Sequence, residues 1–217
     1  MWFKKEDTQK DRAVYIILDR SGSMANGWAE TLGAINSYIK KLEDDVSVYV
    51  AAFDSDNGVD YKQLREDVAS KVSPLTNADV EPRGMTPLYD AVGKCADKML
   101  SDNAKRAVLV VMTDGYENSS REYSKDAIKA KLKALEAKDW PTVFLGANFD
   151  SVTSYATQTF GVAATNTINT TVRNRGATFD LYNAKTANYF AATACSAESV
   201  NSMKVTDEEK KKLDAEA

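Results

Sequence analysis

The sequence feature that most constrains the fold is an apolar run near the N-terminus that stops at an acidic residue. Val14 to Leu18 are consecutive apolar residues, and Asp19, Ser21 and Ser23 follow at alternate positions. A run of this kind is typical of a strand that is buried on both faces. Hard divalent cations prefer several oxygen ligands from small side chains on one loop. The segment therefore predicts a central strand that ends either in a metal site or in a polar turn capping the next helix.

Further apolar runs alternate with segments of helical periodicity along the chain. Buried strands are expected at 13–18, 46–53, 107–112 and 141–146, a hairpin partner at 59–61, and a short edge strand at 162–164. Helices are expected at 28–42, 86–99, 124–138, 151–160 and 175–192, with a loop at 165–174. This alternation implies βαβ crossovers, so we predict an α/β fold with a mostly parallel sheet covered by helices on both faces.

Composition favours one soluble domain. The chain has 217 residues, of which 43% are hydrophobic, and this is sufficient for a two-sided core. Its net charge is −4, and its 28 basic residues are scattered, which argues against nucleic acid as a partner. The first residues mix both charge signs without an apolar h-region, and no apolar run is long enough to span a bilayer. We therefore expect a cytoplasmic protein.

The cysteine and histidine content restricts the chemistry. Cys95 and Cys195 stand in apolar contexts, 100 positions apart, and are expected to be small buried hydrophobes rather than a disulfide. The sequence contains no histidine. This excludes catalytic schemes that need Ser-His-Asp or Cys-His, and it excludes His-ligated zinc.

We expect three regions in the chain. Residues 1–12 are a polar lead-in, residues 13–192 form the folded domain, and residues 193–217 form a polar tail. Within the tail, Thr206 and Glu209 have the spacing of a capping box, but Leu213 is the one large apolar residue after Thr206. The tail is therefore expected to be a frayed helix or disordered rather than docked.

Three polar clusters fall at predicted strand ends or helix starts. They are the Asp19-x-Ser21-x-Ser23 loop, Thr86 before Pro87, and Asp114 after the strand 107–112. Taken singly, each cluster has a purely structural interpretation. The first two could cap a helix, and Asp114 could belong to a turn. Together they would gather at one sheet edge, where ligands of open parallel sheets bind. Hydroxyl and carboxylate oxygens without Cys or His select Mg²⁺ or Mn²⁺.

These residues resemble a known family. The segments DRSGSM after an apolar strand, GMTP opening a helix, and VLVVMTDG closing the next strand are similar to the von Willebrand factor type A domain and its metal-ion-dependent adhesion site. The resemblance covers about residues 12–192. It implies a Rossmann-like sheet with one short antiparallel edge strand, here expected at 59–61.

The resemblance also implies a ligand set and a partner. Ser21, Ser23 and Thr86 would offer hydroxyls to Mg²⁺ or Mn²⁺, while Asp19 and Asp114 would hold it directly or through water. An open position on the ion would accept an Asp or Glu carboxylate from a partner protein, without catalysis. The segment FLGANFDS, 144–151, is similar to bacterial and phage members of the family, and it would bring Asn148 and Asp150 near the same edge.

Other interpretations stay open at this point. Asp54 and Asp56 could hold a second cation, although a solvated turn is the better interpretation of that pair. A metal ion on such a sheet could also activate water against phosphate esters, with Asp19 as nucleophile. The sequence supplies no second acid two residues after Asp19, which weighs against a phosphoesterase. A third possibility is a structural scaffold with a degenerate site.

Overall fold

The computed structural model describes residues 10–56, 58, 60–147, 151–192 and 194–216. Its strands are β1 (Arg12–Asp19), β2 (Ser47–Asp54), β3 (Asp60–Val68), β4 (Arg106–Thr113), β5 (Thr142–Ala147) and β6 (Thr167–Thr170). Its α-helices are α1 (Trp28–Lys40), α2 (Leu88–Asp102), α3 (Lys125–Glu136), α4 (Val152–Phe160), α5 (Arg175–Ala191), α6 (Ala197–Asn201) and α7 (Asp207–Ala215). Short 3-10 turns are η1 (Gly22–Ala25), η2 (Ala69–Lys71) and η3 (Ala164–Asn166).

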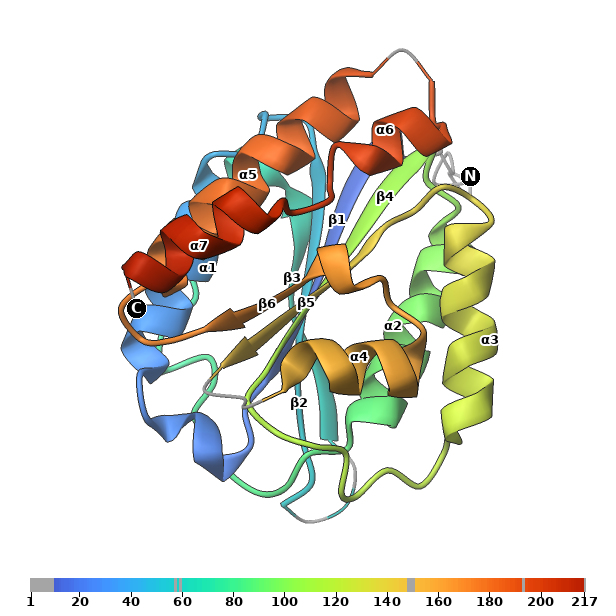
Figure 1. Cartoon of the computed structure of the whole chain (residues 1–217). Helices are drawn as coiled ribbons and strands as arrows, with labels where there is room; N and C mark the ends of the chain where they lie inside the picture. Colours follow the sequence, from blue (N-terminus) through green and yellow to red (C-terminus); the bar gives the residue numbers. More distant parts are fainter. Residues whose placement is uncertain (1–9, 57, 59, 148–150, 193, 217) are drawn as a thin grey trace, which may run out of the picture.

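The strands form one sheet in the order β3-β2-β1-β4-β5-β6. All neighbouring pairs are parallel except β2 and β3, which pair antiparallel at one edge. Figure 1 shows helices packed around the sheet, with α1 and α5 together and α2 and α3 together. The predicted α/β class, with a mostly parallel sheet and an antiparallel edge strand, is confirmed.

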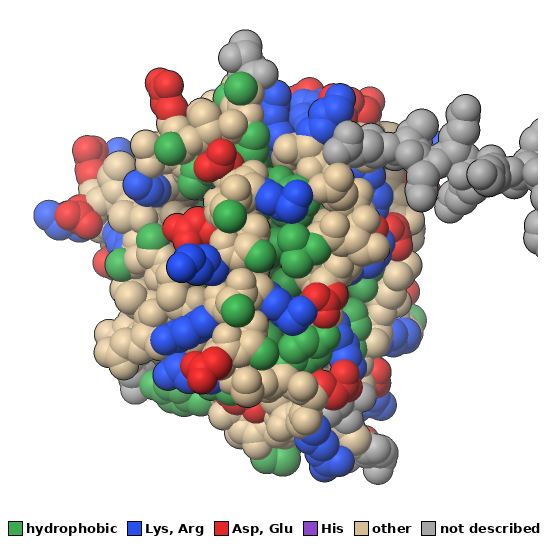
Figure 2. Space-filling view, turned by 90° about the vertical axis from the view of Figure 1, so that its right-hand side faces the viewer, with side chains coloured by type: hydrophobic (Ala, Val, Ile, Leu, Met, Phe, Trp, Pro, Cys, Tyr) green, Lys and Arg blue, Asp and Glu red, His purple; other side chains and the backbone are tan. Residues whose placement is uncertain are grey.

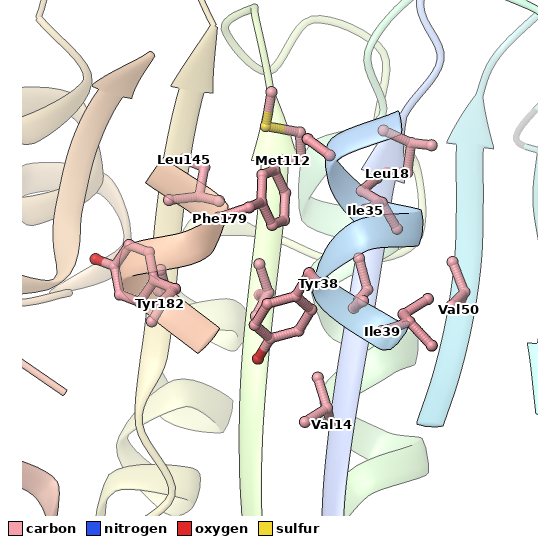
Figure 3. Close-up of a cluster of buried hydrophobic side chains, with 14 of the residues drawn as sticks. Val14, Leu18, Ile35, Tyr38, Ile39, Val50, Met112, Leu145, Phe179 and Tyr182 are labelled. Atoms are coloured by element: carbon pink, nitrogen blue, oxygen red, sulfur yellow. The ribbon is translucent and has the colours of Figure 1, made fainter. Parts of the chain in front are cut away.

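The core has two layers because the central strands are apolar at every position. Val14, Ile16 and Leu18 of β1 belong to the layer that includes residues of α1 and α5. Tyr15 and Ile17 alternate with them and belong to the layer that includes residues of α2, α3 and α4. Figure 3 shows the first layer, in which Tyr38 of α1 and Phe179 of α5 lie over the sheet. Alternating side chains on opposite faces explain how one apolar run serves both layers.

The two edges of the sheet differ from the expectations. The antiparallel strand β3 is longer than the predicted 59–61, because its backbone pairs with β2 along Asp60–Val68 although its side chains are largely charged or polar. The last strand is Thr167–Thr170, not 162–164, and it lies inside the predicted loop. Its threonine hydroxyls donate to the backbone carbonyls of Ala164 and Gly146. These hydrogen bonds help to hold the strand in the sheet although it has few apolar residues.

The expectation of a frayed or disordered tail is wrong. Met203, Val205 and Leu213 are buried in the same core layer as α5. The α7 helix begins at the predicted capping box, in which the Thr206 hydroxyl accepts from the Glu209 amide and the Glu209 carboxylate accepts from the Thr206 amide. Sparse apolar residues suffice here because they fall on the side that meets the domain.

Two smaller observations complete the fold. Both cysteines are free thiols, with Cys95 buried and Cys195 half-buried beside the Tyr189 hydroxyl at 3.3 Å. Among the described residues, no helix combines the length and apolar character that a membrane span requires.

Candidate metal centre

The polar ends of β1 and β4 lie side by side at one end of the sheet. The two strands are parallel neighbours, with Leu18 opposite Met112. Asp19 is the last residue of β1, and Asp114 comes directly after Thr113 at the end of β4. The fold therefore brings together two carboxylates that are 95 positions apart in the sequence, counting from Asp19 to Asp114.

Hydrogen bonds join the serines of the first loop to Asp114. The Ser23 hydroxyl donates to Asp114 Oδ1 at 2.7 Å, and the Ser21 hydroxyl lies 3.5 Å from the same oxygen. The two serine hydroxyls are 3.1 Å apart. Three oxygen-bearing side chains thus converge on one point. Ser21 is buried and Ser23 is exposed, so the cluster reaches the surface.

Asp19 is fully buried beneath this cluster. Its carboxylate accepts hydrogen bonds from the Thr113 hydroxyl at 2.6 Å and from the Ser21 amide at 2.7 Å. Burial raises the pKa of Asp19 to about 7, because it removes the charged carboxylate from water, while these hydrogen bonds oppose the shift. Burial also raises the pKa of Asp114. A cation at this point would offset both effects.

Thr86 lies beside the turn that follows Asp114, two residues before the start of α2. This residue is buried, and its backbone N–H donates to Asn118 Oδ1 at 2.8 Å. The helix begins at Leu88 with Pro87 as its N-cap, whereas the sequence predicted Thr86 as the cap, so Thr86 does not cap it. A Cβ added to Gly115 would lie 3.4 Å from the Thr86 hydroxyl, which places that hydroxyl against the turn after Asp114.

Backbone hydrogen bonds fasten the two loops of the site to each other. The Gly22 amide donates to the Gly84 carbonyl at 3.1 Å, and the Arg83 amide donates to the Arg20 carbonyl at 2.6 Å. Gly84 has φ +66°, and a Cβ at this position would lie 2.7 Å from the Asp56 amide nitrogen. Glycine is therefore required here for both conformation and space. The segment before Thr86 is held in register with the DRSGS loop.

Arg20 and Asp54 form a buried ion pair next to the site. Asp54 is fully buried and contacts the Arg20 guanidinium, and the half-exposed Arg83 also pairs with it. Arg20 further reaches Asp60 at 2.5 Å. The interpretation of Asp54 as part of a solvated turn is therefore wrong, and its two arginine partners occupy its carboxylate, whereas Asp56 is exposed. Arg20 points neither to solvent nor to an approaching ligand, because Asp54 neutralises it.

The donor set fits a small hard cation. Within the described part of the chain, neither Asp19 nor Asp114 makes an ion pair, so two adjacent carboxylates lack a direct positive partner. The described residues contain no group of three or more His, Cys, Asp or Glu side chains placed to hold a metal. The site instead combines two carboxylates with three hydroxyls, which is the chemistry of Mg²⁺ or Mn²⁺ rather than zinc.

Several residues around the site were not predicted from the sequence. Thr113 holds Asp19, and Asn118 holds the Thr86 backbone. Arg175, buried at the start of α5, donates Nη1 to the Gly27 carbonyl and the Thr31 hydroxyl, both at 2.7 Å. Thr113 and Asn118 lie within four residues of Asp114 and could have been noticed, whereas Arg175 lies far away in sequence. Asn148 and Asp150 lie outside the described residues.

Two exposed apolar side chains flank the site. Met85, next to Thr86, is 51% exposed, and Tyr116, two residues after Asp114, is 54% exposed. Among the described residues, these two are the large hydrophobic side chains that are exposed to solvent. Apolar side chains beside a polar cluster are a common feature of surfaces that bind proteins.

The geometry and the sequence agree with one family. A sequence model of the von Willebrand factor type A domain matches residues 13–206, which is most of the chain. The chain belongs to the von Willebrand factor type A domain family. The match continues into the segment from 193 onward, in agreement with the docking of that segment. A search of curated proteins gives no match.

Solved structures show the same fold at low sequence identity. A von Willebrand factor type A protein from Catenulispora acidiphila is 16% identical with a TM-score of 0.59, covering 82% of this chain and 43% of its own. The pilus adhesin SpaC of Lactobacillus rhamnosus GG, in an open conformation, is 12% identical with a TM-score of 0.67, covering 84% and 31%. The corresponding domain of the pilus tip protein Mfa5 from Porphyromonas gingivalis is 10% identical with a TM-score of 0.65, covering 87% and 99%. The chain spans less than half the length of the first two.

Proposed function

We propose that this protein is a non-catalytic binding module that holds Mg²⁺ or Mn²⁺ and uses it to bind an acidic residue of a partner protein. Ser21, Ser23 and Thr86 would hold the ion together with Asp19 and Asp114. When bound, the ion supplies a coordination position that a carboxylate can fill. The chain's own residues fix the ligand loops, exclude water from Asp19 and surround the open side of the site.

One observation carries this proposal. Ser21, Ser23 and Asp114 converge within hydrogen-bond distance at the surface, above a buried aspartate that lacks an ion-pair partner in the described chain. A helix cap or a simple turn would not require two carboxylates to approach each other in this way, because their mutual repulsion is unfavourable.

The surroundings indicate the kind of partner. Met85 and Tyr116 would contact apolar side chains next to the partner's Asp or Glu, because both are exposed beside the ligand loops. The relatives SpaC and Mfa5 are named a pilus adhesin and a pilus tip protein, which agrees with a role in protein binding. A cytoplasmic location stays a prediction from the N-terminal sequence.

Metal binding and partner binding can be tested separately. Mg²⁺ or Mn²⁺ should raise the melting temperature of the native chain, because a ligand selective for the folded state stabilises it. A pull-down with the immobilised chain in Mg²⁺ should retain a protein that EDTA releases. The variant with Asp19→Ala and Asp114→Ala should lose both responses. The matched control changes two exposed carboxylates on distant helices, Asp126→Ala and Asp214→Ala, and should keep both responses.

Two results would contradict the proposal. The first is a melting temperature that does not respond to either cation. The second is retention of the same partner in EDTA and by the Asp19→Ala, Asp114→Ala variant. Turnover of a phosphate ester that depends on the metal and on Asp19 would instead favour an enzyme.

A further inference from the structure

A cavity of about 510 Å³ lies at the opposite end of the sheet from the candidate metal centre. It is bordered by α3, the start of β5, the end of α4 and α6. Figure 2 faces the side of the molecule where α3 lies and shows hydrophobic side chains in a band down the middle of this face, with Lys and Arg side chains beside it. Its volume is within the range of small-molecule sites in proteins.

The walls of the cavity are apolar and rigid. Leu132, Trp140, Phe160 and Val162 line it, and each is less than a tenth exposed. All four belong to the core layer beneath α2, α3 and α4, so packing on the other side fixes their positions. Val200, which is half-buried, adds apolar surface that a ligand can contact, and apolar surface of this kind favours an apolar group over water.

The rim of the cavity is positively charged. Lys129 and Lys133 come from successive turns of α3, and Lys204 comes from the segment after α6. None of these lysine side chains makes an ion pair with a described residue, whereas many other lysines of the chain do. Glu136 and Asp139 are the acidic side chains that line the cavity, so lysines outnumber acids there although the whole chain is acidic. The local charge therefore favours an anion.

We propose that this cavity is a binding site for a small amphipathic anion. The apolar body would lie against the part of the cavity that Val162 and Val200 line, and the anionic group would lie among the rim lysines. This site is separate from the metal centre, because it lies where β5 begins whereas the metal ligands follow the ends of β1 and β4.

The probe for this proposal is 8-anilinonaphthalene-1-sulfonate, which combines an aromatic body with an anionic group. We expect saturable fluorescence enhancement with one site per native chain. Ala163→Trp places a large side chain on the cavity rim and should weaken binding by about tenfold. Ala130→Trp introduces the same side chain at an exposed position of α3 that does not line the cavity, and it should bind like the unaltered chain.

The charge requirement is tested by a second pair of variants. Lys133→Glu should weaken binding of the probe by about fivefold, whereas Lys125→Glu, on the same helix but outside the cavity, should leave it unchanged. Octanoate should displace the probe more effectively than 1-octanol, which has the same apolar body without the charge. Non-saturable binding, equal affinity of the two Trp variants, or equal displacement by octanoate and octanol would overturn the proposal.

Discussion

Arg20 shows that a residue within a loop of candidate metal ligands need not face the metal. It stands in the middle of the DRSGS segment, yet its side chain is buried against Asp54 and Asp60 on the far side of the loop. Its carbonyl accepts from the Arg83 amide. Arg20 therefore stabilises the loop that carries the proposed metal-binding residues. Its charge is not directed at the metal or at a partner.

Replacing Arg20 should test this structural role. Arg20→Ala leaves the fully buried Asp54 with only the half-exposed Arg83 as partner, and removal of one member of a buried pair costs about 3 kcal/mol. The free energy of unfolding, measured by urea denaturation, should fall by about that amount. Arg83→Ala is the matched control and should cost much less than Arg20→Ala, because its side chain is 46% exposed. Equal losses would contradict the assignment.

Asp19 should show a conflict between stability and metal binding. Its buried negative charge is unfavourable without a cation, so Asp19→Asn should raise the melting temperature of the metal-free chain at pH 8 by roughly 2 to 4 °C. The same variant should lose the stabilisation by Mg²⁺. Differential scanning fluorimetry with and without Mg²⁺ measures both effects, and Asp126→Asn should change neither. A variant that is less stable without metal would count against this view of Asp19.

At the scale of elements, the sequence predicted best where burial is uniform. The apolar runs of β1, β2, β4 and β5 and the periodic helices are specified by local sequence, and the structure confirms them. The motif residues were also placed together, because parallel neighbouring strands bring their carboxyl ends to one edge. The extent of β3 and the position of β6 were predicted wrongly, because backbone pairing and threonine hydroxyls replace an apolar pattern there. The interpretation of Thr86 as a helix cap was also wrong, since the helix begins at Leu88.

The segment after α5 was misjudged because its contacts are with distant residues. Met203 is fully buried, although its neighbours in sequence are polar. Met203→Ala should therefore lower the free energy of unfolding by about 3 kcal/mol, the usual cost of a cavity in a packed core. Met85→Ala, which truncates a 51% exposed side chain, should change it by less than about 0.5 kcal/mol. Urea denaturation of both variants decides whether this segment is docked, since similar small effects would indicate that it is not.

At the scale of the whole molecule, a charge network ties the antiparallel edge strand to the centre. Asp102 of α2 accepts hydrogen bonds from the Tyr15 hydroxyl, Lys10 and Lys98 at 2.7 to 2.8 Å. The same two lysines contact Glu66 of β3 at 3.1 and 2.8 Å. Burial alone would raise the pKa of Asp102, but hydrogen bonds from Lys10, Lys98 and Tyr15 outweigh it and lower that pKa. The pKa of Glu66 is lowered for similar reasons.

This network should make stability depend on acid pH. A carboxyl group with a lowered pKa in the folded state stabilises the fold above its unfolded pKa of about 4, and the effect is lost as the pH falls through the folded pKa. Asp102→Asn should therefore lower the melting temperature at pH 7 by about 3 °C, and the difference should shrink below about pH 3. Thermal unfolding across pH measures it, with Asp214→Asn as the exposed control. A difference independent of pH would contradict the network's role.

The backbone bonds between Gly22 and Gly84 and between Arg83 and Arg20 have a thermodynamic consequence for the proposed function. The loop that carries Met85 and the loop that carries the serines cannot move independently, so a partner that contacts Met85 also acts on the residues that hold the ion. Any factor by which the cation increases affinity for the partner must then equal the factor by which the partner increases affinity for the cation. Where free Mg²⁺ is scarce, a larger fraction of the partner-bound protein than of the free protein would hold its ion.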